Sequence, residues 1–247
     1  MVLRPVKCPH CKSTEVKKYG NAGNGKQRYL CCNEECSHKT FVESYTYSAY
    51  EPYIRERIFF AAVNGSGTRA TARMLGIANN TVTETLRSIE PQLWYVNANY
   101  FENHDEIALE IVSVEEAEMD EMWSFVGDKS HQCWLWWAID HNTGEPLAFC
   151  FGTREHKYLD ALLELLKPFK INTVYSDGNF AYKTHITGSN VVTGKRNTQK
   201  IERKHLSLRT LCSRLVRKGI RFSKSYDMHK IVIALIINFW FFNRILW

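Results

Sequence analysis

The spacing of apolar residues changes near residue 114, and this change divides the chain. Before it, apolar residues fall at helical spacing in three runs between residues 52 and 90, separated by the turn-prone segments NGSG and Gly76-Ile77. After it, apolar runs predict strands at 115–126, 132–140, 146–153 and 172–176, with a weaker strand at 190–193. Helical patterns cover 157–169, a short stretch from 179, about 198–217, and the chain from residue 227 onward.

The order of the elements after residue 113 predicts the fold class. Three successive strands are followed by a helix and a strand in alternation, which is the order of a ribonuclease-H-like α/β fold. Residues 93–113 have no sustained period and are expected to form a polar linker. The sequence therefore predicts one catalytic-sized domain over residues 114–247, preceded by smaller units.

Residues 1–45 are rich in Cys, Gly, Asn and Lys, and a segment of this composition needs a cross-link to fold. Cys8 and Cys11 form one close pair, and a hairpin-length loop later Cys36 forms a second pair with either Cys31 or Cys32. Two such pairs are typical of a four-thiolate zinc site. The sequence thus predicts a zinc ribbon with Zn²⁺ held by Cys8, Cys11, Cys31 and Cys36.

Two alternatives remain for this metal site. Cys31 is preferred over Cys32 because the strand-like QRYLC segment reaches Cys31 first, and His10 or His38 could replace one thiolate. Unrelated free thiols are the other interpretation, and the clustering disfavours it.

The helical runs of residues 50–92 have the pattern of a helix-turn-helix DNA-binding domain. Gly76 permits the left-handed turn between two helices, and Ala72 allows them to cross closely. We expect Asn79 or Asn80 to cap the third helix. Exposed side chains of that helix could enter a major groove; the candidates for DNA contact are Asn80, Thr81, Thr83 and Arg87. A plain three-helix packing module is the alternative.

The charge is uneven and favours a polyanionic partner. The chain has 32 Lys and Arg against 26 Asp and Glu, a net charge of +6, and the excess gathers in residues 195–221. A basic helix here is expected to contact double-stranded DNA through Lys200, Arg203 and Lys204. A solvated helix face is the alternative.

Cysteine usage and the apolar segments indicate the cellular compartment in which the protein is expected. Cysteines at metal-ligand spacing favour a reduced compartment, and the N-terminal residues lack an apolar run of signal-peptide length. The apolar stretch 231–242 is too short to span a bilayer and is expected to form a buried terminal helix. We therefore expect a cytoplasmic, DNA-associated protein without a membrane partner.

Three acids are the candidates for catalysis. Asp120 lies within the first strand, Asp177 ends the strand 172–176, and Glu202 lies near the start of the basic helix. Carboxylates on neighbouring strands and a facing helix can hold two divalent cations, Mg²⁺ or Mn²⁺, which is the arrangement that cuts and joins phosphodiester bonds. Taken singly, each acid has a structural alternative: Asp177 as a helix cap, Glu202 in an ion pair on its own helix, and Asp120 as an edge acid.

Other acids near these three are expected to have other roles. Glu118 and Glu121 flank Asp120, and we expect neither of them to share its face of the strand. Asp140 ends the next strand and is expected to serve the turn before HNTGE rather than to act as a fourth ligand.

The motifs resemble one known family over nearly the whole chain. CPHC, GKQRYLC and NGSGTRATARMLGIANNTV are similar to the zinc-ribbon and helix-turn-helix part of insertion-sequence-one transposases. AEMDEMWSFVG, SDGNF, TQKIERKHLSLR and FSKSYDMHKIVIALIIN resemble the catalytic part of the same family.

The resemblance implies an Asp-Asp-Glu triad formed by Asp120, Asp177 and Glu202. Residues 178 to 201, 24 in all, separate the last two acids, a short interval typical of that family. The family pattern adds Trp123, His205 and Arg209 as supporting residues. It implies recognition of terminal inverted repeats, strand cleavage and strand transfer into target DNA, by a homodimer or a larger assembly. The alternatives are a DNA-binding regulator with an inactive C-terminal domain and a structure-specific nuclease of the same fold.

Overall fold

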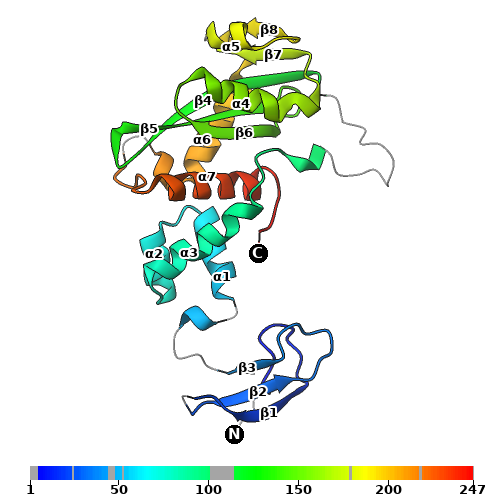
Figure 1. The fold of residues 1–247 in the computed structure, drawn as a ribbon, viewed down its shortest axis with the longest axis vertical. Coiled ribbons are helices and arrows are strands. Elements are labelled where there is room, and N and C mark those ends of the chain that lie inside the picture. Colours follow the sequence, from blue (N-terminus) through cyan, green and yellow to red (C-terminus); the bar gives the residue numbers. More distant parts are fainter. Residues whose placement is uncertain are drawn as a thin grey trace.

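The computed structural model describes residues 5–23, 25–43, 48–51, 53–100, 114–177, 180–216 and 219–246. Along its longest axis the chain forms three stacked parts: a small N-terminal sheet, a group of three helices, and a larger sheet covered by helices (Figure 1). The C-terminal helix α7 (Tyr226–Trp240) lies between the three helices and the larger sheet.

The N-terminal part is a three-stranded antiparallel sheet. Its order is β1-β2-β3, formed by β1 (Val16–Asn21), β2 (Gln27–Cys31) and β3 (Thr40–Val42). Among the residues that the structure describes in this part, the buried apolar cluster consists of Cys8, Cys31, Cys36 and Phe41. Because a core of this size cannot stabilise a unit of about 40 residues by itself, the fold depends on a cross-link.

The three helices have helix-turn-helix geometry. They are α1 (Ile54–Val63), α2 (Thr68–Leu75) and α3 (Asn79–Ile89). Gly76 ends α2 in the left-handed conformation with a φ of 64°, as expected, and its N–H donates to the Ala72 carbonyl. The prediction that Asn79 or Asn80 caps α3 is wrong. Ile77 is buried, which places Ala78 at the N-cap position, and no side chain caps the helix.

The larger sheet has the ribonuclease-H-like arrangement that the element order predicts. Its order is β6-β5-β4-β7-β8, and it consists of β4 (Glu116–Val126), β5 (Asp128–Asp140), β6 (Pro146–Gly152), β7 (Thr173–Ser176) and β8 (Asn190–Thr193). β6, β5 and β4 pair antiparallel, whereas β7 pairs parallel with β4 and β8 parallel with β7. Gly127, with a φ of 78°, makes the β4–β5 turn so tight that β5 begins four residues before the predicted Gln132.

Alternate residues of the strands fill two separate cores. Helices α4 (His156–Leu166) and α5 (Phe180–His185) cover one face, where Trp136 and Ala138 of β5 are buried. Helices α6 (Gln199–Leu211) and α7 cover the other face, where Leu135 and Trp137 are buried. This alternation decides which strand residues can meet Glu202, because α6 lies on the Trp137 face.

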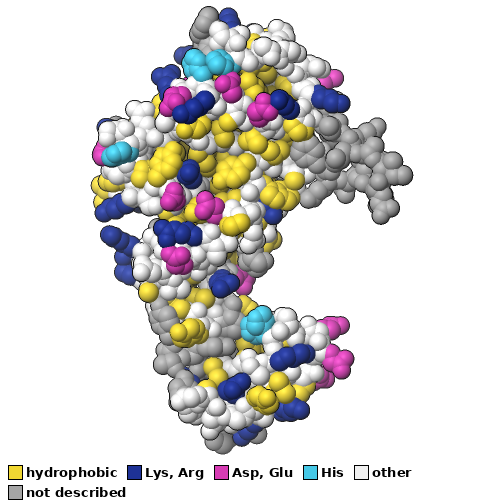
Figure 2. Space-filling model, viewed as in Figure 1, with side chains coloured by type: hydrophobic (Ala, Val, Ile, Leu, Met, Phe, Trp, Pro, Cys, Tyr) yellow, Lys and Arg dark blue, Asp and Glu magenta, His cyan; other side chains and the backbone are white. Residues whose placement is uncertain are grey.

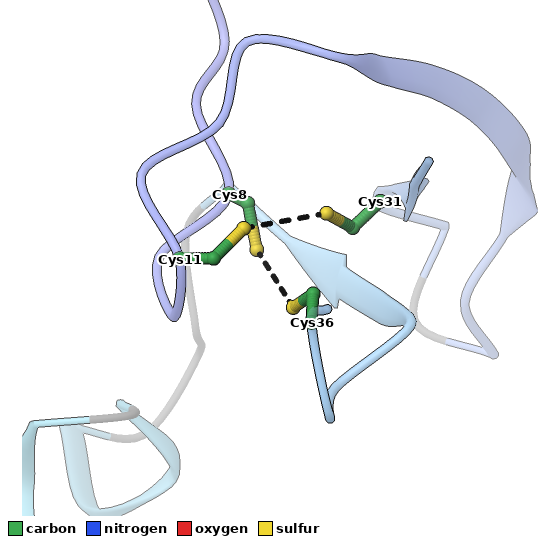
Figure 3. Close-up of side chains that lie close together, drawn as sticks. All are labelled: Cys8, Cys11, Cys31 and Cys36. Carbon is green, nitrogen blue, oxygen red and sulfur yellow. Dashed lines mark hydrogen bonds between the residues drawn. The ribbon is translucent and has the colours of Figure 1, made fainter. Parts of the chain in front are cut away.

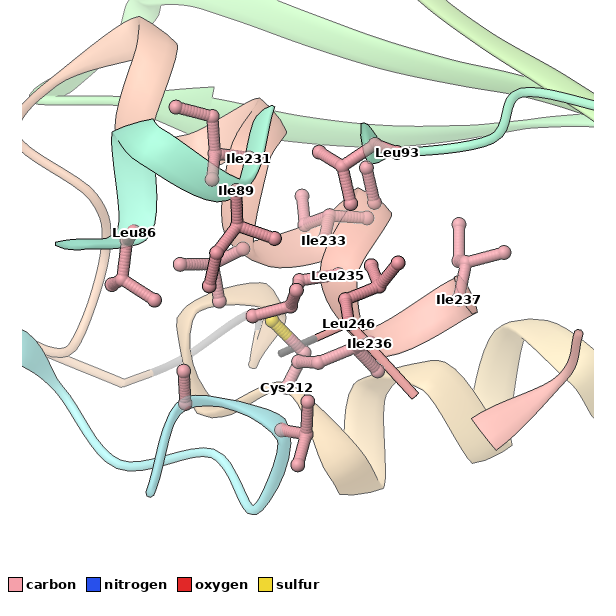
Figure 4. Packing of buried hydrophobic residues seen from close by; sticks show 14 of the residues in the cluster. Leu86, Ile89, Leu93, Cys212, Ile231, Ile233, Leu235, Ile236, Ile237 and Leu246 are labelled. Carbon is pink, nitrogen blue, oxygen red and sulfur yellow. The ribbon is translucent and has the colours of Figure 1, made fainter. Parts of the chain in front are cut away.

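The helix-turn-helix part and the sheet share one hydrophobic core through α7. Figure 4 shows Leu86 and Ile89 of α3 beside Ile231 and Ile233 of α7 in this cluster. The Trp240 indole N–H donates to the Val63 carbonyl over 2.8 Å. Helix α7 has 15 residues and is largely buried, as expected for the terminal helix. In the part of the chain that the structure describes, no helix combines the length and the apolarity needed to cross a membrane.

Residues 93–100, expected to begin a polar linker, instead pack on the catalytic part. Val96 forms a β-bridge with Ala148, and the buried Asn97 donates its backbone N–H to the Leu147 carbonyl over 2.7 Å. The Asn238 side chain of α7 accepts from the Trp94 backbone N–H and donates to its carbonyl, 2.9 Å each. The expectation of a polar linker missed these contacts, because they join residues about 50 and 144 positions apart in the sequence. The rest of the expected linker, 101–113, lies outside the described residues.

The basic helix ends earlier than its sequence pattern predicts. We expected it to extend to about residue 217, but α6 ends at Leu211 and Cys212 has extended backbone angles. Arg214, which falls within the range expected to be helical, donates to the Met228 carbonyl over 3.1 Å and to the Ser223 hydroxyl. These contacts turn the chain back toward the start of α7, so Arg214 is an internal link and not a DNA-facing cation.

Candidate active site

Asp120 lies in the middle of β4 on the face covered by α6. Its side chain is 15% exposed, and one carboxylate oxygen accepts the Glu121 backbone N–H over 2.8 Å. Burial, together with the charges of Glu121, Asp177 and Glu202, raises the pKa of Asp120 to about 7, although the hydrogen bond from the Glu121 backbone lowers it in part. An acid with this environment is well suited to bind a cation, because a bound positive charge offsets both the burial and the repulsion.

Asp177 and Glu202 approach Asp120 from two other elements. Asp177 follows β7, which pairs parallel with β4, so its position is next to the strand that holds Asp120. Glu202 lies exposed in the first turn of α6. Both carboxylates act electrostatically on Asp120. The three acids therefore face a common region, although among the described residues the four cysteines, and not these acids, form a group close enough to hold a metal ion as they stand.

Glu118 is a residue of this site that the sequence reasoning placed incorrectly. It was expected to face away from Asp120, but residues two apart on a strand share a face, and Glu118 is buried beneath α6. One oxygen accepts the Ile201 backbone N–H over 2.9 Å, and the other contacts Nδ1 of His141 at 2.8 Å. Glu118 therefore joins β4 to the N-terminal turn of α6, beside Glu202. The alternation of strand side chains is the signal that could have found it.

Glu121 faces the other side of β4, as expected. Its carboxylate accepts the Tyr182 hydroxyl over 2.9 Å, and the Arg154 guanidinium lies 3.9 Å away. Burial, with Glu121, Asp120 and Asp177 nearby, raises the pKa of the buried Tyr182 well above its usual value. Tyr182 was missed by the sequence reasoning, since one tyrosine on a short helix gives no pattern.

The three supporting residues lie in different surroundings. His205 is buried on α6, one turn after Glu202, with Nδ1 3.6 Å from an oxygen of Asp120. Trp123 is half-buried on the opposite face of β4 from Asp120, where its ring lies 5.5 Å from that of Phe125. Arg209 is half-buried further along α6. His205 thus contacts Asp120 directly.

Asp140 serves the β5–β6 turn, as expected. One of its oxygens accepts the backbone N–H groups of Asn142 and Thr143, and the other accepts the Tyr100 hydroxyl over 3.4 Å. A carboxylate bound in this way stabilises the turn and is not available as a fourth ligand.

Four cysteines converge in the N-terminal part (Figure 3). Cys8 and Cys36 have sulfurs 3.8 Å apart, those of Cys11 and Cys31 are 3.6 Å apart, and all four ligand atoms lie within 4.8 Å of one another. Cys32 is exposed and lies outside the cluster. The backbone N–H of Ser13, with the neighbouring thiols, lowers the pKa of Cys11 to about 7, whereas burial raises the pKa of Cys31 and Cys36, a cost that a bound cation would offset. This donor set and spacing fit tetrahedral Zn²⁺.

We expect Cys31→Ser to lose zinc and unfold the N-terminal sheet, whereas Cys32→Ser should keep both. Zinc binding and folding are coupled in a unit with so small a core. Measured zinc content and limited proteolysis of residues 5–43 test this, with the exposed neighbour as the matched control. Equal zinc content in the two variants would contradict the assignment.

The candidate DNA-reading face of α3 is directed away from the shared core. Val82, Leu86 and Ile89 are buried against the rest of the protein. Asn80 and Arg87 are exposed, and Thr81 and Thr83 are half-buried. The Arg87 guanidinium contacts Glu84 at 2.7 Å, an exposed pair that DNA could separate at little cost.

The basic residues of α6 differ in their partners. Lys200 donates to the backbone carbonyls of His141 and Asn142, the latter over 2.8 Å, so it joins α6 to the β5–β6 turn. The Lys204 ammonium lies 5.1 Å from the centre of the Phe241 ring. Arg203 is exposed. Figure 2 also shows Lys and Arg side chains gathered on the side where α2 and the loop between α6 and α7 lie.

Three antiparallel strands followed by two parallel ones, with helices on both faces of the sheet, define a protein of the ribonuclease-H-like class. A family model described as IS1 transposase, of the DDE type, matches residues 112–243, which is more than half of the chain. The chain therefore belongs to the IS1 transposase family. A second model, described as the InsA C-terminal domain and of the helix-turn-helix type, matches residues 45–89.

Curated relatives and solved structures are similar to parts of this chain. The InsB protein of insertion element iso-IS1n from Shigella dysenteriae is 46% identical over 121 residues, which cover 49% of this chain and 92% of that protein. An IS1 InsB protein of Escherichia coli K12 is 43% identical over 122 residues, covering 49% and 73%. The catalytic core of BIV integrase has 14% identity and a TM-score of 0.36 over 51% of this chain and 83% of that chain. A simian T-cell lymphotropic virus intasome has 12% identity and a TM-score of 0.36, covering 74% and 67%.

Proposed function

We propose that this protein is a metal-dependent transposase that cleaves the ends of its insertion element and joins them to target DNA through Asp120, Asp177 and Glu202. The observation that carries the proposal is the placement of these acids: Asp120 lies on β4, Asp177 directly follows the parallel neighbour β7, and Glu202 lies in the first turn of α6, which packs on the face of the sheet that holds Asp120. Membership of the IS1 transposase family supports the same reaction class.

The three carboxylates would hold Mg²⁺ or Mn²⁺, and the fit rests on their chemistry. Hard divalent cations prefer carboxylate oxygens, and repulsion among the acids favours a positive charge between them. When bound, the ions supply a deprotonated nucleophile and stabilise the leaving oxygen. Glu118 keeps the start of α6 against β4, so it preserves the spacing between Glu202 and Asp120.

We propose that DNA is held at two surfaces of different kind. The exposed face of α3 reads terminal inverted repeats in the major groove, and Arg203 on α6 contacts the phosphate backbone near the acids. Because α1–α3 share a core with α7, the reader has a fixed position relative to the active site. Coordinated joining of two element ends requires two such units, so we propose a dimer or a larger assembly as the active form.

One assay separates this function from a DNA-binding regulator and from a nuclease. The protein is incubated with Mg²⁺, a labelled duplex carrying the element's own end, and a supercoiled target plasmid. A transposase nicks at the end and joins the label to the plasmid. Binding without nicking would favour the regulator, and nicking without joining would favour the nuclease; either result contradicts the proposal.

The two DNA surfaces predict different binding defects. Arg87→Ala is expected to weaken binding to the element's end by about 1–3 kcal/mol with little effect on random duplex, since base contacts carry specificity. Arg203→Ala should weaken binding to both duplexes about equally. It should also reduce the slope of log affinity against log salt concentration by the amount expected for roughly one lost phosphate contact. Fluorescence anisotropy at several salt concentrations measures both. An equal loss on both duplexes for Arg87→Ala would contradict the reading role of α3.

A further inference from the structure

Trp137 makes a buried contact with His205 beside the candidate active site. Trp137 is fully buried on β5 and is the register partner of Asp120 on β4. Its indole Nε1 lies 2.8 Å from Nε2 of His205. The two ring planes are 6° apart, with ring centres 5.4 Å apart, so the rings lie side by side. The other ring nitrogen of His205, Nδ1, faces Asp120 at 3.6 Å.

The chemistry of the two rings fixes the direction of this hydrogen bond. An indole N–H can only donate, so Nε2 of His205 must be the acceptor. A neutral imidazole carries one proton, and with Nε2 accepting, that proton is on Nδ1. Nδ1 is the nitrogen that faces Asp120. Trp137 thus determines which nitrogen of His205 can donate to the carboxylate.

We propose that Trp137 is a positioning residue of the active site, which acts on Asp120 through the tautomer and orientation of His205. This inference rests on the proposed catalytic role of Asp120. The Nδ1–H of His205 is directed at one carboxylate oxygen of Asp120, while the Glu121 backbone N–H holds the other. Each oxygen keeps a further lone pair for a cation. Polar groups that face a metal-binding carboxylate in this way orient it, and their loss typically costs 10- to 100-fold in metal affinity or activity.

The adjacent residue Trp136 provides a matched control. It is as buried as Trp137, on the same strand, and its indole N–H also makes one hydrogen bond, to the Thr153 carbonyl over 3.0 Å. Its side chain points to the opposite face of the sheet, toward α4 and α5. Trp136→Phe therefore removes an equivalent indole and N–H without touching His205.

Nitrogen NMR of the His205 ring tests the inference directly. In magnesium-free, zinc-loaded protein at neutral pH, with the His205 signal identified by its loss in His205→Asn, we expect the wild type to show the proton on Nδ1. Trp137→Phe should shift the ring toward the Nε2–H tautomer, whereas Trp136→Phe should leave it unchanged. An unchanged His205 spectrum in Trp137→Phe would overturn the inference.

End cleavage provides the second measurement. Trp137→Phe is expected to lower the cleavage rate at saturating DNA by roughly 10- to 100-fold, with DNA affinity unchanged within about twofold, because Trp137 acts through metal-ligand positioning. Trp136→Phe should retain the rate. Equal rates in the two variants would overturn the positioning role.

Two features of the design keep the outcomes distinct. If Trp137→Phe does not fold, 3-benzothienylalanine at position 137 replaces the N–H by sulfur in a ring of the same shape, with the same expected results. If the wild-type protein fails to cleave, the proposed function fails, while the tautomer measurement still decides whether Trp137 orients His205.

Discussion

Asp120→Asn, Asp177→Asn and Glu202→Gln are each expected to lower end cleavage and joining by on the order of a thousandfold or more. Metal-ion catalysis contributes several kcal/mol to the transition state, and each 1.4 kcal/mol corresponds to a factor of ten in rate. The loss should appear in both reactions, since both use the same carboxylates. Single-turnover cleavage of a labelled end duplex in Mg²⁺ measures the effect.

The control for the triad is an exposed acid on another face of the protein. Asp160 on α4 contacts His185 at 2.8 Å and is not among the charges that raise the pKa of Asp120. Asp160→Asn should therefore cleave at the wild-type rate. DNA affinity of the triad variants should remain near that of the wild type, which separates a catalytic defect from misfolding. Near-normal cleavage by any one triad variant would remove that residue from the site.

Asp120→Asn is expected to stabilise the magnesium-free protein at pH 8 while it abolishes activity. The pKa of Asp120 is raised from 3.8 to about 7 in the folded protein, so the folded state binds its proton more tightly than the unfolded state does. Stability from this group is complete below pH 3.8 and is lost as the pH rises toward 7. A shift of about three units corresponds to at most about 4 kcal/mol.

Urea unfolding with and without Mg²⁺ measures this gain. Asn cannot ionise, so the stability advantage of the variant should be largest at pH 8 and shrink as the pH falls toward 4. Added Mg²⁺ should narrow the difference at pH 8, because a cation favours the carboxylate of the wild type. An advantage independent of pH would mean that burial and repulsion at Asp120 are not the cause.

Local patterns predicted the secondary structure well where local chemistry decides it. The weak strand at 190–193 matches β8, because its β-branched residues pair with β7. The left-handed Gly76 marks the end of α2. The choice of Cys31 over Cys32 agrees with the cluster, since the end of β2 carries Cys31 into the interior. Each of these depends on residues close together in the sequence.

Contacts between distant residues account for what the sequence did not predict. The segment 93–100 has no period of its own, and it is ordered by pairing with Ala148 and with Asn238 of α7. The basic helix ends at Leu211, and beyond it Arg214 donates to the Met228 carbonyl. Helical propensity depends on local residues and therefore cannot predict this contact.

The sequence predicted the acids of the candidate site but not the residues that hold them in place. Glu118 and Trp137 act through His141, His205 and the start of α6, which the fold alone brings together. Trp137 lies within the apolar run CWLWWAID, where nothing local distinguishes it from Trp136. Successive residues of a strand point to opposite faces of the sheet, and α6 covers the face of Trp137, so Trp137 has a different role from Trp136.

The position of the bound cation tests the central claim most directly. Crystals of the protein with its end duplex and Mn²⁺ would be measured at the manganese absorption edge. We predict anomalous peaks about 2.1 Å from carboxylate oxygens of Asp120, Asp177 and Glu202. Manganese bound only at other acids, such as Glu121 or Asp140, with the three carboxylates not in contact with metal, would contradict the account.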